Sequence, residues 1–149
     1  MNAIVTPQPA AASLMRRTRP SLWRLWAAGT GIAAILVAVA FQIAKEVADP
    51  LVVSGTGEVT LGNVIGMTVI GATVGAAFAY GIGRFTERPR RVFVVVTLIA
   101  LVGYAVVPFT AAESVGTALW LNVFHVVVAV PVIVALTRCL PSERVSTEA

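Results

Sequence analysis

The chain has 149 residues, of which 58% are apolar and only 12% are charged, and its mean hydropathy is +0.89. Ordinary globular domains are about 45–50% apolar and about 25% charged, so this composition argues against a water-soluble domain and favours a protein whose solvent is lipid. The net charge of +4 arises from basic residues spread over three segments, which form no nucleic-acid motif, so no nucleic-acid partner is expected.

Residues 1–24 are predicted to form a flexible cytoplasmic tail. The first 13 of these residues are rich in proline and alanine and offer too little apolar surface to build a core. The apolar run that follows is longer than the roughly 7–15 residues of a signal-peptide core, so it is expected to be a retained membrane span.

Four segments without Asp, Glu, Lys or Arg follow, and each has close to the ~20 residues that a helix needs to cross a bilayer. They are residues 25–44, 61–83, 92–112 and 117–137. The sequence therefore predicts an all-α fold, a four-transmembrane-helix bundle with antiparallel up-down topology. Residues 25–137 form its single membrane domain, and residues 138–149 form a C-terminal cytoplasmic tail.

The connections and prolines give local predictions. Residues 45–60 contain the turn signals Asp49-Pro50 and Ser54–Gly57, so a loop is expected there, with a short extended piece at residues 51–53. Residues 113–116 are few enough to make the last two spans a tight antiparallel hairpin. Pro108 and Pro131 each lack a backbone N–H and are predicted to kink the third and fourth spans.

Basic residues mark one side of the predicted membrane. Ten of the eleven precede the first span, separate the second from the third, or follow the fourth, and Lys45 alone lies on the other side. The positive-inside rule then places both termini in the cytoplasm and the protein in the cell (plasma) membrane as a multi-pass protein. The inner loop is expected to meet anionic lipid headgroups through Arg84, Arg88, Arg90 and Arg91.

The second span carries small residues at every fourth position, which predicts a helix-packing face. These residues are Gly71, Gly75, Ala79 and Gly83. Small side chains let a neighbouring helix approach closely, which is how helices associate in lipid. The neighbour is either another span of the same chain or the same helix of a second copy.

The only histidine, His125, lies in the fourth span, at about the depth of Tyr104 in the third. With Asn122 one turn away and Thr68 in the second span, it forms a candidate intramembrane polar site. The face of the fourth span opposite His125 is expected to face lipid; it holds Leu119, Phe124, Val127 and Val134. His125 is either a neutral ring bonding neighbouring helices, a proton- or substrate-binding group, or a metal or haem ligand completed by another subunit.

The remaining chemistry gives no catalytic set. One cysteine, Cys139, excludes a C-x-x-C thiol or zinc site, and all acidic residues fall outside the spans. No enzyme activity, cofactor or resident metal is therefore expected. The predicted function is a non-enzymatic accessory or interaction protein whose partners are the bilayer and a membrane protein or second copy. The alternative is a small transporter or channel subunit that uses His125 as its only titratable intramembrane group.

Four stretches also carry a family resemblance: "LWAAGTGIAA", "GEVTLGNVIG", "RFTERPRRVF" and "LNVFHVVVAVPVI". Over residues 22–140 the chain resembles an uncharacterised actinobacterial family of small four-helix integral membrane proteins, a domain of unknown function. In that family the histidine of the fourth span and the basic inner loop recur. The resemblance implies the same fold and orientation and no known activity.

Overall fold

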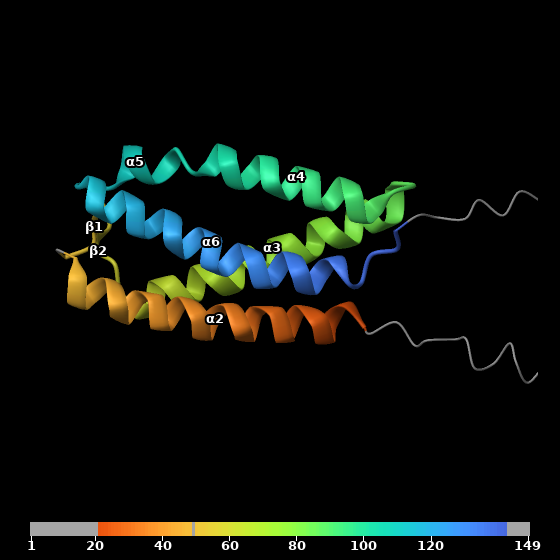
Figure 1. Ribbon diagram of the computed structural model, residues 1–149, viewed down its shortest axis with the longest axis horizontal. Coiled ribbons are helices and arrows are strands. Elements are labelled where there is room, and N and C mark those ends of the chain that lie inside the picture. The colour runs from red at the N-terminus through yellow and green to blue at the C-terminus, as the bar shows by residue number, and fades with distance from the viewer. Residues whose placement is uncertain (1–20, 49, 143–149) are drawn as a thin grey trace, which may run out of the picture.

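Four long helices lie side by side in an antiparallel bundle (Figure 1). The computed structural model describes residues 21–48 and 50–142. The long helices are α2 (Leu22–Val47), α3 (Leu61–Phe85), α4 (Pro89–Tyr104) continued by the short α5 (Val107–Ala111), and α6 (Val115–Thr137). The predicted all-α four-helix bundle is confirmed.

The helix starts follow local sequence signals. The hydroxyl of Thr60 accepts a hydrogen bond from the backbone N–H of Asn63 at 3.3 Å and caps α3. Ser114 caps α6 in the same way, because its Oγ accepts the N–H of Thr117 at 3.1 Å. Pro89 starts α4, a position where its missing N–H costs nothing. Each cap satisfies a backbone donor that has no partner inside its own helix.

The two prolines within the spans act differently. Pro108 cannot donate to the carbonyl of Tyr104, and the third span is interrupted at Ala105 and Val106, between α4 and α5. The helix resumes after the break, so α4 and α5 together still provide 23 residues of span. By contrast, α6 runs through Pro131 without interruption. Only the proline of the third span therefore divides its helix.

The loop between α2 and α3 is more ordered than the sequence predicted. Helix α2 extends to Val47, and the short strands β1 (Val52–Val53) and β2 (Gly57–Glu58) pair into a hairpin. Gly55 and Gly57 have φ values of 82° and 80°, which side chains other than glycine rarely adopt. The hairpin is tied to the turn before α6, since Ser54 N–H donates to the carbonyl of Ala111 at 2.9 Å.

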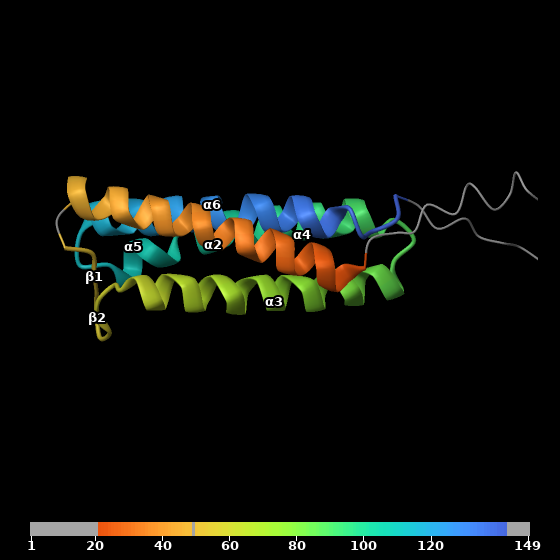
Figure 2. The ribbon, with the colours of Figure 1, turned by 90° about the horizontal axis from the view of Figure 1, so that it is seen from below.

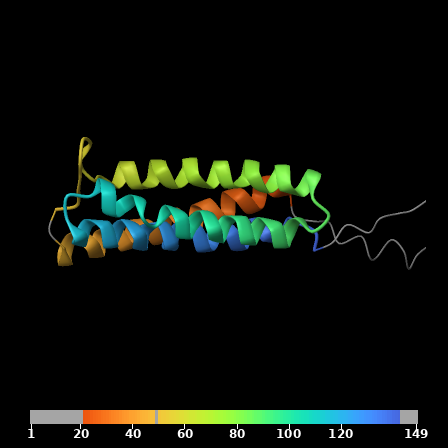
Figure 3. The same ribbon diagram turned by 90° about the horizontal axis from the view of Figure 1, so that it is seen from above.

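The core consists of two clusters, and α2 and α6 make the most extensive helix contact. Figures 2 and 3 show α3 along one side of this assembly. The first cluster contains Ala33, Ala72, Ala79, Phe93, Val132 and Leu136. The second, nearer the hairpin, contains Val37, Phe41, Ala44, Leu51, Val64 and Phe124. The first cluster alone thus draws on all four long helices.

Phe124 was predicted to face lipid, and that prediction is wrong. Its side chain is only 5% exposed, and its ring centroid lies 6.2 Å from that of Phe41 and 6.1 Å from that of Trp120. Val127 also packs against this cluster, whereas Leu119 is 54% exposed. The buried face of α6 is therefore rotated from the one that small and polar residues suggested.

The exterior of the bundle is apolar on every helix. Large exposed side chains include Ile35 on α2, Met67 on α3 and Val102 on α4. Water-soluble monomers rarely expose continuous apolar surface of this extent. The four spans have 23–26 residues each and mean hydropathies of 1.6–2.6, so they are long and apolar enough to cross a membrane. These helices indicate a multi-pass integral membrane protein.

Candidate functional site

Tyr104 and His125 lie in contact where α4 passes α6. Their ring centroids are 4.7 Å apart and their planes are inclined by 46°. Tyr104 is the last residue of α4, directly before the break that Pro108 causes, and it is about half exposed. The His125 ring is half-buried. The antiparallel course of the two helices therefore brings these two side chains to one depth.

The hydrogen bond of His125 determines which ring nitrogen carries the proton. Nδ1 lies 2.6 Å from the carbonyl oxygen of Leu121, one turn earlier on the same helix. A carbonyl oxygen only accepts, so Nδ1 must donate. In the neutral ring, Nε2 then keeps its lone pair and can accept a proton or a hydrogen bond.

Asn122 and Thr68, the other two members of the predicted polar site, also bond to their own helices. The side-chain amide of Asn122 donates to the carbonyl of Ala118 at 3.0 Å. The buried hydroxyl of Thr68 donates to the carbonyl of Val64 at 2.8 Å. The structure therefore brings together Tyr104 and His125, while Asn122 and Thr68 are satisfied within α6 and α3.

Two buried donors on α2 were not singled out from the sequence. Within residues 21–48 and 50–142, Trp26 Nε1 and Thr30 Oγ1 are the buried side-chain nitrogen and oxygen atoms that lack a hydrogen-bond partner. They lie four residues apart, one turn of helix, and Thr30 is 7% exposed. The four-residue spacing of Trp26 and Thr30 was the sequence signal for this pair. A tryptophan near the end of a span is more commonly an anchor at the membrane interface, so the pair was not singled out.

The small-residue face of α3 packs against the end of α6 over most of its length. A Cβ added at Gly75 would lie 3.6 Å from Cδ1 of Leu136, and one at Gly83 would lie 3.1 Å from Cδ2 of Leu140. Ala79 is fully buried. Gly71 makes no such contact within the chain, because an added Cβ there would meet nothing within 4 Å. Three of the four small residues thus pack inside the chain.

The closest approach between helices occurs instead at Gly29. A Cβ added there would lie 2.7 Å from Cβ of Ala135 and 3.4 Å from the carbonyl oxygen of Pro131. Only glycine allows α2 and α6 to come this close. Gly29 and Ala33 are spaced four apart in the first span, and this small pair was the signal that the sequence offered.

The basic residues of the inner loop lie at the end of the bundle opposite the hairpin (Figure 1). Arg84 belongs to the last turn of α3, Arg88 precedes α4, and all four of the predicted headgroup arginines are exposed. Arg90 and Arg91 line a hollow of about 340 Å³ together with Val94, Val95 and Ser142. Within residues 21–48 and 50–142, no group of three or more His, Cys, Asp or Glu could hold a metal ion.

Replacing His125 with leucine is expected to cost less than about 1 kcal/mol and to leave membrane accumulation intact. The reason is that the hydrogen bond of His125 stays within α6, so losing this bond breaks no hydrogen bond between helices. Accumulation in membrane fractions and the unfolding midpoint in detergent measure the effect. His125→Asn serves as the matched polar control. Failure of the leucine variant alone would show that a polar side chain at position 125 is needed to hold α6 in the bundle.

One protein family matches the greater part of this chain. The family is described as a family of unknown function (DUF6069), and its match covers residues 17–142. No curated protein and no solved structure matches the chain at a significant level. The match includes all four long helices and the turns that join them.

Proposed function

We propose that this chain, which belongs to the family of unknown function DUF6069, is a non-enzymatic accessory protein of the plasma membrane. In this role it binds another membrane protein within the bilayer.

The observation that carries the proposal is that five polar side chains of α3, α4 and α6 bond to their own helices. Thr68, Asn122 and His125 all use the carbonyl four residues earlier, and so do Thr73 on α3 and Thr97 on α4. Such bonds satisfy each group locally. A proton or solute path would instead need polar groups that connect across helices. The arrangement favours a role in association over one in transport.

The outer face of α3 supports association. Opposite its packed face, α3 exposes small residues between large ones: Gly66, Thr73 and Ala77 are exposed beside Ile70 and Tyr80, and a Cβ added at Gly66 or Gly81 would meet nothing within 4 Å. Small residues at these positions let a second helix approach closely, and the large side chains beside them can pack against it. This face is where a partner helix is expected.

Photocrosslinking in native membranes tests the proposal. A photoreactive amino acid replaces Ala77 on the outer face of α3, and the control carries it at Ile35, an exposed position on α2. The expected result is one discrete crosslinked product, of fixed mass, from position 77 and none from position 35. Equal lipid-only labelling at both positions, together with pH-dependent solute flux in vesicles that hold the protein, would overturn it.

The proposal includes an orientation with both ends of the chain in the cytoplasm. Of the basic residues that the structure describes, six lie toward the end of the bundle that holds the α3–α4 turn and only Lys45 lies toward the other end: the six are Arg24, Arg84, Arg88, Arg90, Arg91 and Arg138. Residues 1–24 and 138–149 are the tails of this scheme, and residues 1–20 and 143–149 lie outside the described part of the chain. The asymmetry follows the positive-inside rule.

Cysteine labelling of whole cells is expected to report this orientation. Burial raises the pKa of the Cys139 thiol, which lowers its reactive thiolate fraction at neutral pH. The native cysteine is also replaced by serine, so that the introduced cysteine is the single thiol in each variant. In that background, exposed Ser54→Cys should react with an impermeant maleimide in intact cells. Exposed Ser142→Cys should react only after the membrane is permeabilised. The reverse pattern would invert the topology.

One geometric feature favours a second candidate function, a small proton-coupled transporter. The imidazole of His125 lies beside Tyr104 within the spans, and Nδ1 is the ring nitrogen that bonds to Leu121. A pH gradient applied to vesicles distinguishes the candidates. Flux that His125→Asn abolishes would favour transport, and flux equal to that of empty vesicles would favour the accessory role.

A further inference from the structure

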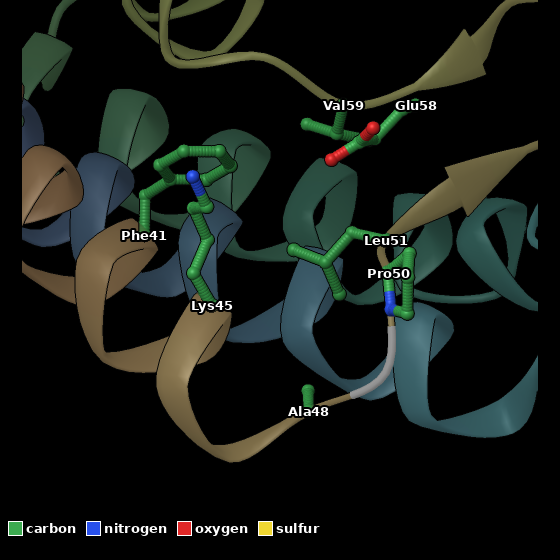
Figure 4. A pocket seen from close by; sticks show the side chains of 7 residues that line it. All are labelled: Phe41, Lys45, Ala48, Pro50, Leu51, Glu58 and Val59. Atoms are coloured by element: carbon green, nitrogen blue, oxygen red, sulfur yellow. The ribbon is translucent and has the colours of Figure 1, made fainter.

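A small hollow lies at the hairpin end of the bundle, between the last turns of α2 and the β1–β2 hairpin. Its volume is about 150 Å³. Figure 4 shows the seven residues that line it: Phe41, Lys45, Ala48, Pro50, Leu51, Glu58 and Val59. It has room for about five water molecules, and it is smaller than the ~300 Å³ at which pockets for whole metabolites begin.

The floor of this hollow is apolar and its rim carries one charge of each sign. Phe41 and Leu51 are 5% and 4% exposed, and they close the bottom. Lys45 extends from α2 alongside the Phe41 ring, and the Glu58 carboxylate points from the end of β2 toward the same space (Figure 4). Both charged residues are exposed, and no ion pair joins them in the part of the chain that the structure describes. Neither charge is therefore neutralised by the other.

The position of the hollow restricts what can occupy it. Lys45 lies in the last turn of α2, at the level where a span leaves the hydrocarbon core and meets the lipid headgroups. It is also the only basic residue in the segments that join the helices at this end of the bundle, residues 45–60 and 112–114. A headgroup of the surrounding leaflet is already at this depth, whereas a soluble ligand would have to compete with it.

We propose that this hollow binds the headgroup of a membrane aminophospholipid, which carries a phosphate and a primary ammonium. The Lys45 ammonium pairs with the phosphate, and the Glu58 carboxylate accepts hydrogen bonds from the lipid ammonium. The apolar floor at Phe41 and Leu51 receives the glycerol and first acyl carbons. The hairpin, which the α5–α6 turn holds in place, sets the separation of the two charges.

The charge pattern selects against other common headgroups. A choline headgroup has the same two charges but no N–H to donate to Glu58. A glycerol headgroup brings a phosphate without a cation, so Glu58 would repel it. Discrimination therefore depends on Glu58, while general attraction to phospholipid depends on Lys45. These separate dependences make the two residues independently testable.

Lipid retention by the full-length protein in mild detergent tests this assignment. The purified protein is titrated with short-chain phosphatidylethanolamine, phosphatidylcholine or phosphatidylglycerol, and bound lipid is counted by native mass spectrometry. The wild-type chain is expected to retain the ethanolamine lipid about fivefold better than the other two, as expected for one exposed charge contact. Equal retention of all three would overturn the proposal without any variant.

Substitutions then separate the two roles. Glu58→Gln should remove the preference for ethanolamine, and Lys45→Gln should weaken retention of all three lipids about fivefold. Glu46→Gln and Glu113→Gln remove exposed acids from the same end of the bundle without touching the hollow, and they should behave as wild type. Helix content by circular dichroism confirms that each variant is folded. A Glu58→Gln variant that keeps the wild-type preference would overturn the assignment.

Discussion

Replacing Phe124 with alanine is expected to lower the free energy of unfolding of the bundle by roughly 2 kcal/mol. The ring is 5% exposed and fills the space between Phe41 and Trp120 in the second core cluster. In lipid, separated helices still keep their side chains in an apolar solvent, so the transfer part of the usual penalty is small. What remains is the cavity and the lost packing contacts.

Reversible unfolding in mixed detergent micelles, followed by circular dichroism, measures this loss. Leu119→Ala is the matched control on the same helix, because Leu119 is 54% exposed and its truncation opens no cavity. It should change the free energy of unfolding by less than about 0.5 kcal/mol. Similar losses in both variants would mean that α6 has been placed with the wrong face toward α2.

Replacing Gly29 with leucine is expected to separate α2 from α6 and to destabilise the bundle by about 3 kcal/mol or more. Even a methyl group at this position would lie 2.7 Å from the Cβ of Ala135, and backbone atoms of Pro131 and Val132 leave no room to shift. Since α2 and α6 form the most extensive contact of the fold, this separation affects both core clusters.

Gly71→Leu is the control for this variant. Gly71 also lies in a span, but an added Cβ there meets nothing within 4 Å, so the larger side chain should be accommodated by lipid. The two variants are compared by the same unfolding titration and by their yield in membrane fractions. A Gly71→Leu variant as unstable as Gly29→Leu would show that the surroundings of Gly71 are as closely packed as those of Gly29.

The site was accessible to sequence analysis only in part. Depth along a span follows from counting residues at about 1.5 Å each, so the pairing of Tyr104 with His125 could be anticipated. The hydrogen-bond partner of each polar group could not be anticipated. His125 bonds to Leu121 and Asn122 to Ala118 because a carbonyl four residues earlier is always within reach, whereas an interhelical partner depends on rotation of the helices.

The outer loop shows a similar division. The turn signals at Asp49-Pro50 and around Gly55 predicted that the chain leaves the helix and reverses, and β1 and β2 do so. The hairpin is attached to Ala111 by a contact between segments more than fifty residues apart, and no local sequence pattern predicts such a contact. That attachment is what positions Glu58 across from Lys45 at the proposed lipid site.

The number of spans and their limits to within a few residues follow from the amino-acid sequence alone. These features depend on bilayer thickness, which acts on each segment separately. The two prolines gave the same sequence signal, and the folded bundle shows that only Pro108 follows a break in its helix. Which face of each helix is buried likewise depends on the packed bundle. In water an apolar stripe marks the core, but α6 is apolar on all sides, and lipid and protein interior are equally good solvents for its side chains. The buried face of α6 is set by close packing at Gly29 and around Phe124, which forms only when the helices are assembled.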